Sequence, residues 1–287
     1  MTNNFSLSRR EEEPENGILY LVGTPIGNLN DISPRAINIL RNVSLIACED
    51  TRQTIKILNK FSISNDLISF NKENSLKKIP KLIADLKVGK SIAVVSDAGM
   101  PGICDPGENI VNKVKSEGID AICIPGACAA ITALVSSGMQ SSKFVFEGFL
   151  PKRKIDREKI LFEISNNEKT TIVYESPHRL KKLLKELLDL CGGDREIVVA
   201  RELTKKYEEH IGNNIENVLS FYQDKEVIGE ITLVIKGNRK ETKQELNKSD
   251  LKRDLNELTN AGLTLSAASR YLAKKHGIKK SIIYNLY

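Results

Sequence analysis

The amino-acid sequence predicts an α/β protein of two domains with a small helical segment at its carboxyl end. Its 287 residues exceed the usual size of one domain, and a 40% hydrophobic and 28% charged composition is that of an ordinary globular chain. Short apolar runs alternate with longer amphipathic stretches, a pattern typical of βαβ units with a mostly parallel sheet. Clusters of Gly, Pro and Asp follow several of the apolar runs, where loops are expected.

The first half of the chain contains four predicted strands, each an apolar run bounded by Gly, Pro or Asp: residues 18–22, 44–48, 92–96 and 119–124. Amphipathic stretches between them predict helices at 34–41, 74–86 and 108–116. Residues 1–16 are polar and lack the apolar segment of a secretory signal, so we interpret them as a disordered tail. The first α/β domain is therefore placed at residues 17–148.

The second half has a mixed order of elements. Strands are predicted at 170–175, 196–200 and 230–235, and helices at 178–190 and 215–222. Residues 149–154 are interpreted as a connector, because a basic run follows Pro151 there. The second α/β domain is placed at residues 149–237.

The carboxyl-terminal segment is basic. Residues 238–248 are polar without an apolar period and predict a linker, and residues 249–287 contain three helical patterns, 250–260, 266–275 and 279–287. Gly262 and Gly277 stand where helices end, and Ser266 stands where the second helix begins. Residues 236–287 carry a net charge of +7, against −1 for the rest. This excess indicates a polyanionic partner such as RNA, with a solvated helical face as the alternative.

Several classes of protein are disfavoured. No run of about 18 apolar residues, the length that crosses a membrane, is present. Five Cys without a C-x-x-C pair indicate reduced thiols in a cytoplasmic protein, and the three His and scattered Cys lack metal-ligand spacing. Neither G-x-S-x-G nor G-x-G-x-x-G occurs, which argues against a hydrolase of the α/β type and a dinucleotide oxidoreductase.

Three turns rich in small residues follow predicted strands. Residues 23–29 form either a tight turn or a loop whose backbone approaches a ligand. Residues 96–107 contain more Gly, Pro, Asp and Ser than a simple turn requires, which predicts a loop that wraps a ligand with backbone groups. Residues 125–130 either face a ligand or allow close packing of a helix on a sheet.

Three charged segments also follow strands. Residues 49–52 bring two acids and an Arg to a helix start, where an N-cap at Asp50 would explain one of the acids. Residues 174–179 and 200–205 place further charges at the ends of later strands. His178 is either a proton carrier or RNA contact, or an ordinary cap or surface residue. Because ligands bind at the carboxyl ends of parallel strands, all six segments are candidates for one site.

Seven segments of the chain, taken together, are similar to those of the tetrapyrrole-methylase superfamily. They are GTPIGNL, CEDTR, SDAGMPGICDPG, PGACAA, FEGFLP, ESPHR and ARELTK. The similarity covers residues 17–237 and is weaker over 249–287, and residues 210–214 depart from the family pattern. CEDTR, ESPHR and the DAG-x-P loop resemble the RNA-modifying branch more than the corrin-type enzymes. The resemblance implies two α/β domains with S-adenosylmethionine (AdoMet) in the cleft between them, and a homodimer. It also implies 2′-O-methylation of a cytidine in 16S ribosomal RNA, within the small ribosomal subunit.

Carried onto this sequence, the resemblance assigns the AdoMet contacts to residues at the strand ends. These are Pro25, Asp97, Ala98, Gly99, Pro101, Ile103, Ala127, Cys128, Phe149, Leu150, Tyr174, Glu175, Ala200 and Arg201.

Five polar residues are hypothesised to face the target cytidine: Glu49, Asp50, Arg52, Glu175 and His178. One of the carboxylates or His178 would accept the hydroxyl proton. RNA phosphates are expected to bind basic residues in two regions, namely Lys152, Arg153, Lys154, Arg179, Arg270, Lys274, Lys275, Lys279 and Lys280.

Two alternative functions stay open. A corrin-type or other small-molecule methyltransferase of the same superfamily would act on a tetrapyrrole and would not need the basic segment. A non-catalytic RNA-binding assembly factor would bind RNA but not AdoMet.

Overall fold

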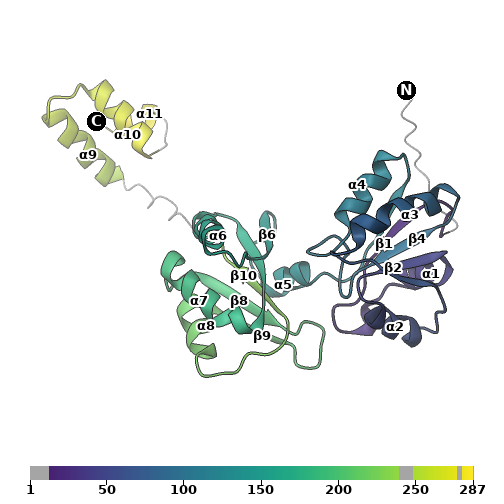
Figure 1. The fold of residues 1–287 in the computed structure, drawn as a ribbon. Coiled ribbons are helices and arrows are strands. Elements are labelled where there is room, and N and C mark those ends of the chain that lie inside the picture. Colours follow the sequence, from purple (N-terminus) through teal and green to yellow (C-terminus); the bar gives the residue numbers. More distant parts are fainter. Residues whose placement is uncertain (1–12, 239–247, 277–279, 287) are drawn as a thin grey trace. The chain divides into compact units, whose positions relative to one another are not determined.

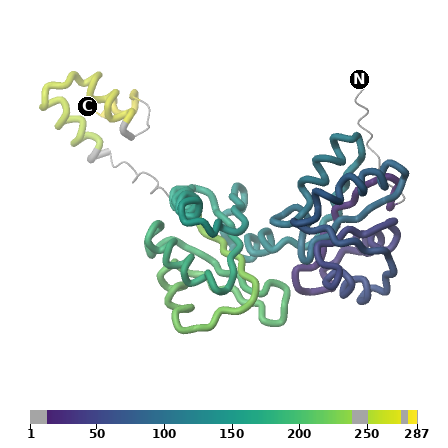
Figure 2. The backbone as a smooth tube through the Cα atoms, viewed as in Figure 1, coloured from purple at the N-terminus to yellow at the C-terminus, as the bar shows by residue number. Residues whose placement is uncertain are grey.

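A computed structural model describes residues 13–238, 248–276 and 280–286. The chain forms two compact units, residues 1–237 and 238–287 (Figures 1 and 2). Most of the predicted tail, residues 1–12, lies outside the described residues, as do residues 239–247 of the predicted linker. Residues 13–16 of the predicted tail are described, and within them the Glu13 carboxylate accepts two hydrogen bonds of 2.6 Å from Arg35.

The first sheet of unit 1–237 has five parallel strands in the order β3-β2-β4-β1-β5. They are β1 (Leu19–Val22), β2 (Leu45–Cys48), β3 (Leu67–Ser69), β4 (Ile92–Val95) and β5 (Ala121–Ile124). The chain between them forms the short η1 (Leu29–Asp31) and the helices α1 (Pro34–Asn42), α2 (Thr51–Lys60), α3 (Ser75–Lys87) and α4 (Glu108–Ser116). Because all five strands are parallel, their carboxyl ends meet at one edge of the sheet.

Two hydrophobic clusters cover the two faces of this sheet. Tyr20 and Ile46 pack with α1 and α2, whereas Leu19 and Ala47, one residue away on the same strands, pack with α3 and α4. This alternation is the period of two that a strand imposes on its side chains. Burial on both faces explains why the strands are continuous apolar runs in the sequence.

The second sheet is mixed, in the order β6-β7-β10-β8-β9. Its strands are β6 (Phe144–Phe149), β7 (Thr170–Glu175), β8 (Glu196–Arg201), β9 (Glu209–Asn214) and β10 (Ile231–Ile235). The first two strands are parallel and the other neighbours antiparallel. The helices α6 (Lys154–Asn166), α7 (Pro177–Cys191) and α8 (Ile215–Tyr222) pack on one face of this sheet.

Helix α5 (Ala129–Ser137) joins the two sheets. It follows β5 of the first sheet, but Ala130 and Leu134 pack against Ile172, Ala200 and Val234 of the second. The sequence did not predict α6, β3 or β9 as elements, and β6 spans the predicted boundary between residues 148 and 149. The two α/β sheets themselves confirm the predicted fold class.

Unit 238–287 contains α9 (Lys248–Asn260), α10 (Leu265–His276) and α11 (Lys280–Tyr284). Leu255, Ala268, Leu272 and Ile283 form its small core. This confirms the predicted helical segment, but the predicted cap at Ser266 is wrong. The helix begins at Leu265, and the Thr264 hydroxyl accepts a 3.3 Å hydrogen bond from the Ala267 amide.

Candidate active site

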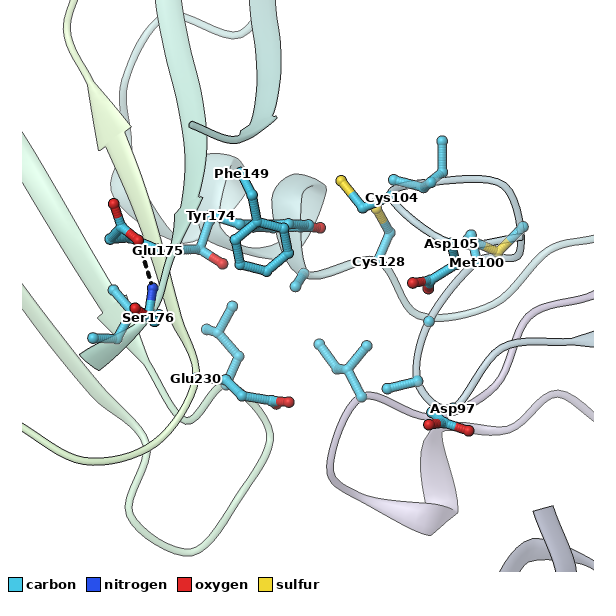
Figure 3. A pocket seen from close by; sticks show the side chains of 18 of the residues that line it. Asp97, Met100, Cys104, Asp105, Cys128, Phe149, Tyr174, Glu175, Ser176 and Glu230 are labelled. Carbon is cyan, nitrogen blue, oxygen red and sulfur yellow. Dashed lines mark hydrogen bonds between the residues drawn. The ribbon is translucent and has the colours of Figure 1, made fainter. Parts of the chain in front are cut away.

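A cavity of about 450 Å³ lies where the carboxyl ends of the first sheet meet the second sheet (Figure 3). This is within the usual range for a small-molecule site. The first half of the chain contributes Ile26, Glu49, Asp97, Ala98, Gly99, Met100, Ile103, Cys104, Asp105, Cys128 and Ala129. The second half contributes Phe149, Tyr174, Glu175, Ser176, Pro177, Leu203, Gly229, Glu230, Ile231 and Thr232.

Backbone hydrogen bonds hold the glycine-rich segments at residues 23–29 and 96–107 together. The Thr24 amide donates to the Gly99 carbonyl over 2.8 Å, and the Gly99 amide returns a bond of 3.1 Å. Gly99 has φ +79°, a conformation that other residues rarely adopt. The loop therefore presents Gly99 and its neighbours Asp97 and Ala98 to the cavity.

The glycine-rich segment at residues 125–130 is explained in part by packing. A Cβ atom on Gly23 would lie 2.7 Å from the Cα of Gly126, so the turns after β1 and β5 touch backbone to backbone. This supports the alternative of close packing for Gly126. Cys128, two residues on, lines the cavity.

The segments at residues 23–29 and 200–205 also meet. The Asn28 amide donates to the Thr204 hydroxyl over 3.0 Å, and a Cβ atom on Gly27 would clash with Lys205. Lys205 in turn pairs with Glu202 at 2.9 Å and with Glu230 at 2.8 Å. The turns that the sequence singled out are therefore connected around one cavity.

The charged segment at residues 49–52 supports the loop at residues 96–107. The Asp50 amide donates to the Asp97 carboxylate over 2.9 Å, and the Asp97 amide donates to Glu49 over 3.4 Å. Asp50 caps α2, and its hydrogen bonds from Arg52 lower its pKa. Glu49 lines the cavity, whereas Asp50 and Arg52 are not among the residues that line it.

Asp105 is a cavity residue that the sequence analysis did not name. Its pKa is raised to about 6, first by burial and then by the negative charges of Glu49 and Asp97, while Lys72 opposes the shift. The Lys72 ammonium donates to the Cys104 carbonyl over 2.5 Å. In the sequence, Asp105 precedes Pro106 and Gly107 and looks like an ordinary turn residue.

Aromatic side chains form the opposite wall. The Tyr174 ring packs 5.0 Å from Phe146 and 5.5 Å from Phe149, measured between ring centroids. The Tyr174 hydroxyl accepts a 3.1 Å hydrogen bond from the Ala130 amide at the start of α5, and burial raises its pKa. Phe149 is 58% exposed and stands at the edge of the cavity.

Glu175 is held by several donors. It is 2% exposed and contacts Arg157 at 3.4 Å and Arg179 at 3.2 Å, and it accepts a 2.9 Å bond from the Ser176 amide. Both carboxylate oxygens are thereby occupied, an arrangement that suits positioning of the turn after β7. His178 is exposed and is not among the residues lining the cavity.

The other predicted cofactor residues lie beside the lining. Pro25, Pro101, Ala127, Leu150, Ala200 and Arg201 are each one to three residues from a lining residue along the chain. Arg201 pairs with Glu209 at 3.2 Å and donates to the Ile228 carbonyl over 3.3 Å. Leu203 and residues 229–232 line the cavity but were not predicted. Residues 229–232 precede or begin an antiparallel strand, whose amino end shares the edge with the carboxyl ends of β7 and β8.

Some of the basic residues predicted to contact RNA are exposed, and others have hydrogen-bond or ion-pair partners within the protein. Lys152, Arg153 and Lys154 are exposed at the start of α6, and Arg270 and Lys274 are exposed on α10. Arg179 is bound to Glu175 and to the Leu150 carbonyl, and Lys280 donates to the Ser266 hydroxyl over 2.7 Å. Lys279 and the side chain of Lys275 lie outside the described residues.

The chemistry of the cavity fits a cationic ligand. Five carboxylates line it, and no Lys, Arg or His is among its lining residues in the described chain. Such a site suits the sulfonium and ammonium groups of AdoMet and disfavours a cofactor with several phosphates. Aromatic and aliphatic groups on the second sheet suit an adenine ring. No group of three or more His, Cys, Asp or Glu in the described residues could hold a metal ion, and no described helix could cross a membrane.

Comparisons with known proteins agree with this geometry. Residues 18–219 match the family model for tetrapyrrole (corrin/porphyrin) methylases. A ribosomal RNA small subunit methyltransferase I from Synechocystis sp. is 43% identical over 270 residues, which cover 94% of this chain and 97% of that protein. The protein of the same name from Thermotoga maritima is 45% identical over 221 residues, which cover 77% of this chain and 99% of the other.

Solved structures show the same fold. A uroporphyrin-III C-methyltransferase from Thermus thermophilus, complexed with S-adenyl homocysteine, matches with a TM-score of 0.54 and 14% identity, covering 75% of this chain and 96% of that one. The family model and the curated relatives span most of the sequence, so the chain belongs to the tetrapyrrole methylase family.

Proposed function

We propose that this chain uses AdoMet to methylate the 2′-hydroxyl of a cytidine in 16S ribosomal RNA. The observation that carries the proposal is the acidic cavity enclosed by the turns of both sheets, which no Lys, Arg or His among the described residues lines. The names of the relatives, which are 43% and 45% identical, support ribosomal RNA as the substrate.

In this proposal the loop at residues 96–107 holds the methyl donor from one side. Asp97, Ala98, Gly99 and Ile103 line the cavity there, and Cys128, Phe149 and Tyr174 line it from other elements. Pro25, Pro101, Ala127, Leu150, Ala200 and Arg201 then support the lining from behind. When bound, AdoMet supplies a methyl group already activated by the positive sulfur.

The task of this chain is then to align the attacking hydroxyl with that methyl group. Alignment of two reactants is worth about 7–11 kcal/mol in favourable cases. Glu49 lines the cavity and accepts a hydrogen bond from the Asp97 amide of the loop. In this proposal it therefore lies between the methyl donor and the hydroxyl that accepts the methyl group. Asp50, Arg52 and His178 stand outside the lining and would meet the RNA beyond the cavity, while Glu175 positions the turn at Ser176.

RNA phosphates are proposed to bind the exposed cations at the start of α6 and on α10. Such contacts are independent of sequence and weaken with salt. A substrate within the small ribosomal subunit, a homodimer and a cytoplasmic location complete the proposal, in line with the family resemblance.

Labelled AdoMet offers a direct test. The protein is incubated with small ribosomal subunits, with free 16S RNA and with a tetrapyrrole, and the labelled nucleotide is mapped after alkaline hydrolysis. We expect an alkali-resistant dinucleotide that contains 2′-O-methylcytidine. Label on the tetrapyrrole alone would establish the small-molecule alternative, and failure to bind AdoMet in an equilibrium titration would favour an assembly factor.

A further inference from the structure

Asp105 differs from the other carboxylates of the cavity in its partners. Glu175 is held by Arg157 and Arg179, and Glu230 pairs with Lys205. Asp97 and Glu49 accept hydrogen bonds from backbone amides. The Asp50 amide donates to the Asp97 carboxylate over 2.9 Å, and the Asp97 amide donates to the Glu49 carboxylate over 3.4 Å. These bonds stabilise the charged form of each carboxylate and fix its direction.

The surroundings of Asp105 keep its carboxylate available to a ligand. Its side chain lies in the cavity beside Met100 and on the same side as Asp97 (Figure 3). The groups that act on its charge are Glu49 and Asp97, which repel it, the Lys72 ammonium, which attracts it, and the Ser96 hydroxyl, which hydrogen-bonds to it. Tyr174 faces it from the second sheet and is neutral at ordinary pH, because burial raises its pKa.

We propose that Asp105 accepts the proton of the hydroxyl group that is methylated. The proposal rests on the function proposed above and names a proton acceptor for it. The O–H bond breaks and its proton passes to a carboxylate oxygen of Asp105. The hydroxyl oxygen bonds to the methyl carbon, and the electron pair of the broken carbon–sulfur bond stays on sulfur.

Two properties suit Asp105 to this step. A carboxyl with a pKa of about 6 is mostly ionised at pH 7.5 and is a stronger base than one with an ordinary pKa. The charge of Lys72 limits the increase in the pKa of Asp105, and its ammonium donates a hydrogen bond to the neighbouring Cys104 carbonyl. Lys72 is therefore a positioning residue for Asp105.

The test compares Asp105→Asn with wild type and with Asp85→Asn. Asp85 is a matched control, because it pairs with Lys90 at 2.8 Å and does not line the cavity. Turnover is measured at saturating AdoMet and RNA from pH 5 to 9, and the affinities for AdoMet and S-adenosylhomocysteine by calorimetry. Carboxyl titration in the ligand-free protein is followed by ¹³C NMR with labelled Asp.

We expect Asp105→Asn to lower kcat by about 100-fold or more and to bind AdoMet within twofold of wild type. A carboxyl resonance that titrates near pH 6 should disappear, together with the loss of turnover on the acid side. Asp85→Asn should behave as wild type, and Asp105→Glu should recover part of the activity.

Other outcomes would overturn the assignment. The carboxylate is excluded as the proton acceptor if kcat is unchanged in Asp105→Asn. It is also excluded if kcat of this variant still falls at low pH as it does in wild type. If Asp105→Asn binds AdoMet more weakly but S-adenosylhomocysteine as tightly as wild type, with kcat unchanged, then Asp105 stabilises the positive charge of the methyl donor and does not accept the proton. A wild-type protein that binds AdoMet but does not methylate RNA overturns the proposed function itself, and this proposal with it.

Discussion

The buried network around Glu175 shows how partners decide what a charged residue can do. Arg157 is 4% exposed and contacts both Glu175, at 3.4 Å, and Glu186, at 2.7 Å. Loss of Arg157 would leave the buried Glu175 carboxylate with Arg179 and the Ser176 amide alone. Removing one partner of a buried pair typically costs about 3–5 kcal/mol. The network therefore stabilises the turn that carries Ser176 and Pro177 into the cavity.

We expect Arg157→Met to lower the free energy of unfolding by about 3 kcal/mol in urea denaturation. Lys182→Met is the control, because Lys182 is a 71% exposed side chain that lies 3.8 Å from the same Glu186, and its loss should cost under about 1 kcal/mol. Equal and small effects of the two substitutions would show that the buried pair contributes little.

The raised pKa of Asp105 also predicts how stability depends on pH. The folded protein holds this proton up to a pKa of about 6, whereas the unfolded chain releases it near 3.8, so stability falls as pH rises between these values. The full shift corresponds to about 3 kcal/mol, and solvent screening of the partly exposed carboxyl reduces it to about 1 kcal/mol.

Asp105→Asn should therefore be more stable than wild type at pH 8 and no more stable at pH 4. Urea denaturation of both proteins at the two pH values measures the difference. A variant that is less stable than wild type at pH 8 would mean that the charge of Asp105 stabilises the folded state.

At the scale of elements, the sequence predicted the strand ends that form the site but not all of its walls. The parallel strands of the first sheet are buried on both faces, so they are visible as apolar runs, and the turns after them contain Asp97, Gly99 and Cys128. The segment at residues 229–232 was missed because it enters the cavity at the amino end of an antiparallel strand. β9 was missed because, as a half-exposed edge strand, it lacks an apolar run.

Asp105 was missed for a different reason. Its raised pKa comes from burial and from Glu49 and Asp97, which are distant in sequence or separated by a loop. Such surroundings are a product of the fold and leave no pattern around the residue itself.

Strand β6 packs closely against the loop at residues 96–107 at Gly148. Gly148 has φ +62°, and a Cβ atom there would lie 2.8 Å from the Cys104 Sγ. Gly118 is a matched control, with φ +72° and no atom within 4 Å of its added Cβ. Both Ala substitutions impose similar backbone strain, but only one displaces a residue that lines the cavity.

We expect Gly148→Ala to weaken AdoMet binding by about tenfold or more, the equivalent of about 1.4 kcal/mol. Gly118→Ala should lower thermal stability and leave the affinity unchanged. Adding Cys104→Ala to Gly148→Ala removes the clash and should restore affinity. An affinity that stays low in the double variant would locate the defect in the backbone of β6.

At the scale of the whole molecule, the chain has two compact units, and each has a hydrophobic core of its own. The core of unit 238–287 consists of its own residues, Leu255, Ala268, Leu272 and Ile283. All the residues that line the cavity belong to unit 1–237. Donor binding and RNA capture should therefore respond separately to changes in the two units.

We expect a chain ending at Gly237 to bind AdoMet within twofold of the full chain and to bind RNA at least tenfold more weakly.

In the full chain, Arg270→Ala combined with Lys274→Ala should reduce the slope of log affinity against log salt by about two, as two phosphate contacts are lost. Lys77→Ala with Lys81→Ala, two exposed residues at the same spacing on α3, controls for a general loss of charge and should change the slope less. Filter binding to 16S RNA from 50 to 300 mM salt gives the slopes. Equal slopes for the two double variants, with RNA affinity undiminished in the shortened chain, would assign RNA capture to unit 1–237 alone.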